Sequence, residues 1–98
     1  MTCMEDLARG CSLLCDILGD SRLLDRDRSY PLPQARYILF AWLRQRGHSL
    51  MEAERATGFS HSTIVYGLKW LSSLERNPAI DPRTHGMLVE FRRSIDGD

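Results

Sequence analysis

The spacing of apolar residues along the chain predicts α-helices. Between positions 4 and 18 the apolar side chains recur every three or four positions, as they do on one face of a helix, and Gly19 ends the pattern. The same spacing follows Pro31 and Pro33 and continues to Gly47. Both prolines are compatible with the first turn of a helix, where their missing N–H is not needed. The first half of the chain is therefore expected to hold two amphipathic helices.

The segment between these two helices is less regular. Leu23 and Leu24 form a short apolar patch with room for one or two helical turns. Positions 25–33 are rich in charged and turn-forming residues, so we expect a loop there.

In the middle of the chain, polar residues mark the starts of two helices. Ser49 and Glu52 have the spacing of a capping box, in which both side chains satisfy free backbone N–H groups. A short helix from Leu50 to Thr57 is expected to follow, with Gly58 supplying the turn. Ser60 is the expected N-cap of the next helix. This pattern of helix, glycine turn and capped helix is typical of a helix-turn-helix.

The helix after Ser60 is predicted to cover about positions 61–76, because Asn77 and Pro78 stop it. Asp81 and Pro82 then have the pattern of an N-cap followed by proline at the first helical position, which opens a last helix. The predicted fold class is all-α, a compact bundle of five to six helices that contains a helix-turn-helix.

The size of the chain is consistent with one core. It has 98 residues, of which 43% are hydrophobic and 27% charged, which is the average of globular domains. We therefore interpret positions 1–98 as a single domain. No apolar run approaches the length that spans a bilayer, so we expect a cytoplasmic protein with no membrane partner.

The second helix of a helix-turn-helix enters the major groove of DNA in many proteins. If Ile64 and Leu68 point to the core, four polar or aromatic side chains fall on the opposite or flanking side. They are His61, Ser62, Tyr66 and Lys69. The helix N-terminus favours a phosphate, and short hydroxyls can reach base edges. Ser, His and Thr are also ordinary residues at a helix start, so this pattern alone leaves a purely structural role open.

Charge is distributed unevenly along the chain. The formal net charge is zero, which argues against an indiscriminate nucleic-acid binder. Positions 36–76 nevertheless hold six Lys or Arg against three Glu, and the segments on both sides are net negative. A basic face with Lys69, Arg36 and Arg28 beside His61 would favour DNA, whereas an apolar or acidic face would favour a protein partner.

Two runs of sequence resemble a known family. The runs are His48-Ser49-Leu50-Met51-Glu52-Ala53 and Gly58-Phe59-Ser60-His61-Ser62-Thr63-Ile64-Val65-Tyr66-Gly67-Leu68-Lys69. They resemble the signature of the C-terminal DNA-binding domain of the bacterial replication initiator DnaA. In that family an S-L-x-E-I helix leads through glycines to an H-[ST]-T-V helix, within a helix-turn-helix of the Trp-repressor-like type.

The resemblance implies a role for particular residues. His61, Ser62 and Thr63 would contact the major groove and Lys69 the DNA backbone, and the loop around Arg26 and Arg28 would approach the minor groove. The chain departs from the family in two places. Its turn, 58–60, is one residue shorter and lacks the family's acid-and-base pair, and acidic residues alternate with the two loop arginines.

Other candidate chemistry is sparse. Cys3, Cys11 and Cys15 have the spacing of neither a disulfide framework nor a zinc site, and we expect reduced, partly buried thiols. His48 and His85 are isolated and are expected to be solvated at the surface. Trp42 and Trp70 are expected in the core. We therefore predict no catalytic residue, no cofactor, no metal site and no small-molecule substrate.

Sequence-selective binding of double-stranded DNA is the predicted function, in a regulator or replication accessory. The candidate DNA-binding residues are Arg28, Arg36, His61, Ser62, Thr63, Tyr66 and Lys69. A lone helix-turn-helix reads few base pairs, so a homodimer or a replication-protein partner is expected, with Val65, Tyr66 or Met87 as candidate contacts. The alternative is a protein-interaction module that kept the fold and lost DNA binding.

Overall fold

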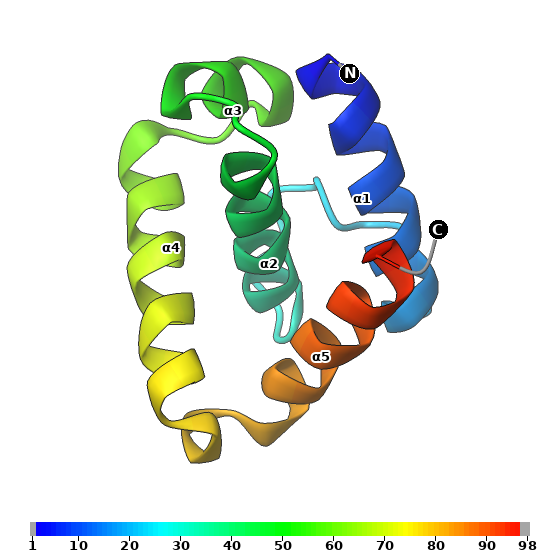
Figure 1. Cartoon of the computed structure of the whole chain (residues 1–98), viewed down its shortest axis with the longest axis vertical. Coiled ribbons are helices and arrows are strands. Elements are labelled where there is room, and N and C mark those ends of the chain that lie inside the picture. The colour runs from blue at the N-terminus through cyan, green and yellow to red at the C-terminus, as the bar shows by residue number, and fades with distance from the viewer. Residues whose placement is uncertain (1, 97–98) are drawn as a thin grey trace.

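A computed structural model describes residues 2–96, and all of its regular structure in this range is helical (Figure 1). In chain order the elements are α1 (Cys3–Leu18), α2 (Leu32–Gln45), α3 (Leu50–Thr57), α4 (His61–Arg76), the 3₁₀ helix η1 (Pro78–Ile80) and α5 (Pro82–Asp96). The predicted fold class is confirmed: the chain is a compact all-α globule of five α-helices, with no strand among the described residues.

Helix α2 occupies the centre of the molecule. It packs against each of the other four α-helices, with α4 on one side, α1 and α5 on the other and α3 across one end (Figure 1). Apolar side chains of α2 are completely buried, among them Leu39, Phe40 and Leu43. Since each surrounding helix turns its own apolar stripe inward, one continuous core forms around α2.

The caps of α3 and α4 form as the sequence predicts. Ser49 Oγ accepts from the backbone N–H of Glu52, and the Glu52 carboxylate accepts from the backbone N–H of Ser49, which completes the capping box. Gly58 ends α3 with a φ of 78°, a left-handed conformation that favours glycine. Ser60 Oγ then accepts from the backbone N–H of Thr63 and caps α4. Three residues therefore separate the two helices.

The start of α5 fixes a long-range contact as well as a helix. Asp81 Oδ1 accepts from the backbone N–H of Thr84, as its predicted capping role requires. The same oxygen accepts from the hydroxyl of Tyr30 at 2.7 Å. The loop before α2 is thereby joined to the start of α5.

The one or two helical turns that the sequence allowed around Leu23 and Leu24 do not form in the segment 19–31. It contains turns and bends and no helix. Leu23 is completely buried, but its carbonyl accepts from the Arg36 side chain. A backbone whose carbonyl groups bond to a side chain of α2 does not continue a helix.

Within residues 2–96, no helix is both long and apolar enough to cross a membrane.

Candidate nucleic-acid interface

The helix-turn-helix predicted from the sequence corresponds to α3, the turn 58–60 and α4. At the middle of the turn Phe59 points into the core, where only 7% of the residue is exposed and its ring lies 5.9 Å from the ring of Phe40. The Ser60 and Thr63 hydroxyl oxygens lie 3.0 Å apart at the start of α4. Both the turn and the first residues of α4 are therefore held in place.

Helix α4 has one buried and one exposed face. Ile64, Gly67, Leu71 and Leu74 are buried. At Gly67 the helix approaches α2 so closely that a Cβ would lie 2.3 Å from Cδ1 of Tyr37. Leu68, expected in the core, is half-buried against it.

The opposite face of α4 carries the predicted side chains. His61, Ser62, Tyr66 and Lys69 are all exposed, and Thr63 is half-buried beside them. Since positions 62, 66 and 69 are separated by four and three residues, their side chains form one stripe along the helix.

A hollow of about 370 Å³ lies beside this stripe. It is lined by Arg28, Pro33, Tyr37, Ser62, Thr63 and Tyr66. Four of these six residues were among the seven predicted from the sequence, although Arg28 is 34 positions away from Ser62 in the chain. The structure thus brings the loop before α2 and the first turns of α4 together around one surface feature.

Sequence reasoning missed Tyr37, which lines this hollow beside the predicted Tyr66. The Tyr37 ring packs edge-on against Tyr66 at 6.0 Å and lies 5.6 Å from Trp70. Burial and the neighbouring Tyr66 raise the pKa of Tyr37, so its phenol stays neutral near pH 7. A possible signal was the spacing of Tyr66 and Trp70, one helical turn apart on α4, but nothing local points to Tyr37.

Two cations of the exposed face have no partner for their charge in the described part of the chain. The Arg28 guanidinium and the Lys69 ammonium make no hydrogen bond or ion pair there, and both residues are exposed. His61 is different, because its Nδ1 lies 3.5 Å from Oε2 of Glu54. The face is therefore mildly basic and offers two free cations to a ligand.

Arg36 was predicted to lie on the basic DNA-binding face, and this prediction is wrong. It is only 4% exposed, and its guanidinium donates to the carbonyl oxygens of Leu23, Asp25 and Asp27. Burial lowers the pKa of Arg36, although arginine remains protonated at any physiological pH. The sequence held a signal: position 36 falls on the buried stripe formed by Leu32, Leu39 and Leu43.

Two further surface expectations are wrong. His48 is 8% exposed instead of solvated, and its Nε2 lies 2.6 Å from Oδ2 of Asp6. Met87 is 7% exposed, so it is not available for contact with a partner. Of the other apolar candidates, Tyr66 is 60% exposed and Val65 is half-buried.

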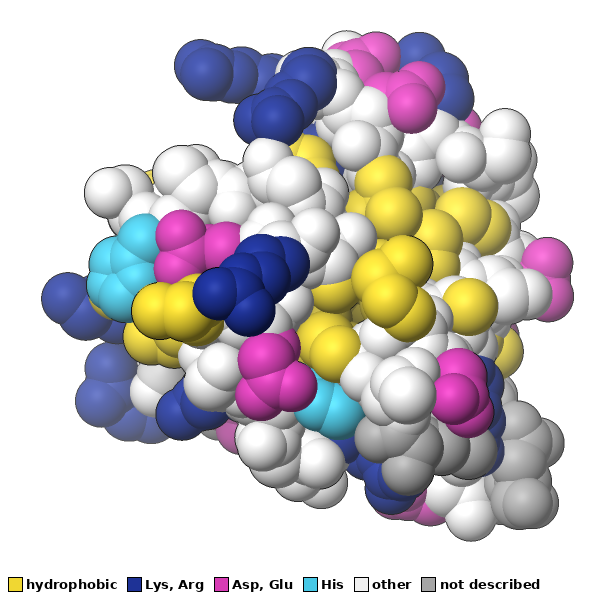
Figure 2. Space-filling view, turned by 90° about the horizontal axis from the view of Figure 1, so that it is seen from above, with side chains coloured by type: hydrophobic (Ala, Val, Ile, Leu, Met, Phe, Trp, Pro, Cys, Tyr) yellow, Lys and Arg dark blue, Asp and Glu magenta, His cyan; other side chains and the backbone are white. Residues whose placement is uncertain are grey.

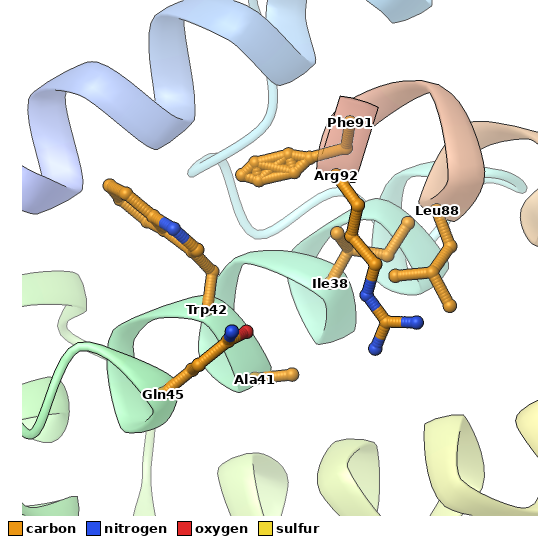
Figure 3. Close-up of a pocket in the computed structure, with 7 residues that line it drawn as sticks. All are labelled: Ile38, Ala41, Trp42, Gln45, Leu88, Phe91 and Arg92. Carbon is orange, nitrogen blue, oxygen red and sulfur yellow. The ribbon is translucent and has the colours of Figure 1, made fainter. Parts of the chain in front are cut away.

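Two other hollows differ in character from the one beside α4. Between α2 and α5 a cavity of about 20 Å³ has room for little more than one water molecule. Its lining includes the rings of Trp42 and Phe91, which pack edge-on at 5.8 Å (Figure 3). A second hollow, of about 220 Å³, lies between α1 and α3 and is lined by Cys3, Met4, Glu52, Arg55 and Ala56. Figure 2 shows the view from above, with hydrophobic side chains gathered in the middle of that face.

All three thiols are half-buried, and Cys11 Sγ lies 4.0 Å from Cys15 Sγ on α1. Trp42 is buried and Trp70 is half-buried against the core.

Comparison of the chain with protein-family models, with curated proteins and with solved structures gives no match.

Proposed function

We propose that this protein binds double-stranded DNA through the exposed face of α4. The observation that carries the proposal is the convergence of Arg28, Ser62, Thr63 and Tyr66 on one open hollow. These side chains come from two distant parts of the chain. Together they combine a cation, two short hydroxyl groups and an aromatic ring, which is a set suited to phosphates and base edges.

In the proposed complex the first turns of α4 enter the major groove. Ser62 and Thr63 contact base edges, and Arg28 and Lys69 contact phosphates on either side. Ser60 caps the backbone N–H of Thr63, so the N–H groups before it remain available to a phosphate at the helix N-terminus. The resemblance of positions 48–69 to the DnaA C-terminal domain supports the same assignment.

The proposed affinity is modest and depends weakly on salt. Each phosphate neutralised by a cation contributes about −0.9 to the slope of log K against log[salt]. Two free cations therefore predict a slope near −2. A single small module of this kind needs a second copy or a protein partner for useful specificity. We accordingly propose a regulator or replication accessory that acts as a homodimer or with a replication protein.

A protein-interaction module is the second candidate function. Two observations favour it: Tyr66 is 60% exposed on α4, and Met4, which lines the hollow between α1 and α3, is 60% exposed. Exposed aromatic and methionine side chains are typical of protein interfaces.

Fluorescence anisotropy tests the DNA proposal. Labelled duplexes of random and initiator-box-like sequence are titrated at two salt concentrations with the wild type and a Ser62→Ala, Lys69→Ala variant. The matched control, Ser12→Ala with Arg93→Ala, likewise removes one hydroxyl group and one positive charge, at exposed positions of α1 and α5. We expect duplex binding that weakens modestly as the salt concentration rises, and that the first variant loses and the control keeps. Absence of binding to every duplex at low salt would refute DNA binding and leave the protein-interaction module.

A further inference from the structure

Two guanidinium groups approach the ring of Phe59 in the turn of the helix-turn-helix. Cζ of Arg26 lies 5.0 Å from the centre of this ring, and Cζ of Arg36 lies 5.1 Å from it. Arginine at this distance is attracted to the face of an aromatic ring. One of the two arginines comes from the loop before α2 and the other from α2 itself.

Arg26 also bonds directly to the backbone of the turn. Its Nη2 donates to the carbonyl oxygen of Gly58 at 2.7 Å, across 32 positions of the chain. Gly58 is the residue whose left-handed conformation ends α3. The Arg26 guanidinium therefore makes both a hydrogen bond and a cation–π contact inside the protein.

The loop that carries Arg26 is itself held in place by Arg36 of α2. The buried guanidinium of Arg36 donates to backbone carbonyls of the loop, including those of Asp25 and Asp27 on either side of Arg26. Arg28, which lines the hollow, follows two positions later. Loop and turn thus form one unit, and the position of Arg28 relative to Ser62 depends on the contact between Arg26 and Gly58.

We propose that Arg26 is a positioning residue of the DNA-binding face and not a DNA contact. It holds the turn 58–60 against the loop, so that Arg28 and Ser62 face the same stretch of duplex. This inference rests on the proposed function. It assigns Arg26 a different role from the minor-groove contact that the resemblance implied for its loop.

The test compares Arg26→Met, which loses the charge and the donors, with Arg28→Met and with Arg93→Met. Arg93 is exposed on α5, so its variant controls for the loss of one positive charge. Amide hydrogen exchange of Gly58 and Phe59, whose N–H groups donate to Glu54 O and Thr57 Oγ1, is measured by NMR on the free proteins. The affinity for duplex DNA is measured as a function of salt.

We expect Arg26→Met to speed exchange in the turn and to weaken duplex binding about fivefold, the change for one net hydrogen bond. Its salt slope should equal that of Arg93→Met. Arg28→Met should instead reduce the salt slope by about 0.9 and leave exchange in the turn unchanged. Arg26→Lys should regain only part of the protection and affinity, because an ammonium lacks the planar fork.

Three results would overturn the inference. The first is unchanged exchange at Gly58 and Phe59 in Arg26→Met. The second is a slope reduced as much as in Arg28→Met, which indicates a phosphate contact. The third is full recovery of affinity by Arg26→Lys. If the wild type binds no duplex, the proposed function fails, and the exchange measurement on free protein still decides whether Arg26 holds the turn.

Discussion

His48 Nε2 lies 2.6 Å from Asp6 Oδ2 and joins the first turn of α1 to the residue that precedes the cap of α3. Asp6 is only 1% exposed, and Nε of Arg46 approaches the same oxygen at 3.4 Å. A buried carboxylate of this kind depends on its partners, because an unpaired charge in the interior is costly. The start of α3 is thus tied to a residue of α1 that lies 42 positions earlier in the sequence.

Replacing Asp6 by Asn should lower the free energy of unfolding at pH 7 by about 1–3 kcal/mol, because the buried donor of His48 loses its charged acceptor. The matched control is Asp16→Asn, an exposed site on the same helix, which should change stability little. Urea unfolding of both variants measures the effect. Equal stability of Asp6→Asn and the control would show that the pair is not stabilising.

The same pair predicts how stability depends on pH. Burial raises the pKa of Asp6, but the hydrogen bond from His48 and the charge and hydrogen bond of Arg46 outweigh burial, so this pKa lies below its usual value. A lowered pKa in the folded state contributes stability that is complete above the unfolded value of about 3.9 and is lost as pH falls through the folded value. Urea unfolding below pH 4 should therefore show a steeper loss of stability for the wild type than for Asp6→Asn. Parallel pH profiles would contradict this assignment.

Gly67→Ala should destabilise the protein by about 1–3 kcal/mol, because the new methyl group would meet the Tyr37 ring at 2.3 Å and force α4 away from α2. Gly86→Ala is the control. Gly86 lies in α5, where an added Cβ would meet no atom within 4 Å, so alanine there should stabilise the helix by about 0.5–1 kcal/mol. Thermal unfolding of the two variants should give shifts of opposite sign. A neutral Gly67→Ala would mean that α2 and α4 pack less closely than the structure indicates.

The thiol of Cys11 should react slowly near neutral pH. Burial and the neighbouring Cys15 raise its pKa to about 11, so little thiolate is present at pH 8. The rate of iodoacetamide modification at Cys11, followed by peptide mass spectrometry, should still be rising above pH 9 in the folded protein. In urea the same cysteine should respond like a free thiol, with a pKa of about 8.5. A native rate that levels off near pH 9 would contradict the raised pKa.

Local sequence patterns predicted the helices well because their causes lie within a few residues. The capping box of Ser49 and Glu52, the left-handed Gly58 and the cap of Ser60 each act inside one turn of chain. These signals placed α3 and α4 at the residues where the structure has them. The helical spacing of Ile64 and Leu68 placed His61, Ser62, Tyr66 and Lys69 on an exposed face.

Contacts between distant segments could not be predicted from local sequence patterns. The charge of Arg36 suggested surface exposure, although its register on the apolar stripe of α2 fitted burial. Nothing near His48 in the sequence indicates Asp6 as its partner, and nothing near Gly67 indicates the Tyr37 ring. These contacts depend on how α2 packs against α1 and α4, which no local pattern specifies.

An NMR titration of ¹⁵N-labelled protein with a short DNA duplex tests the central claim most directly, because it reports which residues respond. The account predicts that chemical-shift changes concentrate at Arg28, Ser62, Thr63, Tyr66 and Lys69, around the hollow beside α4. They should diminish with added salt. The account would be contradicted if no duplex changed the chemical shifts of the protein. It would also be contradicted if the changes centred on the hollow between α1 and α3 that Met4 and Ala56 line.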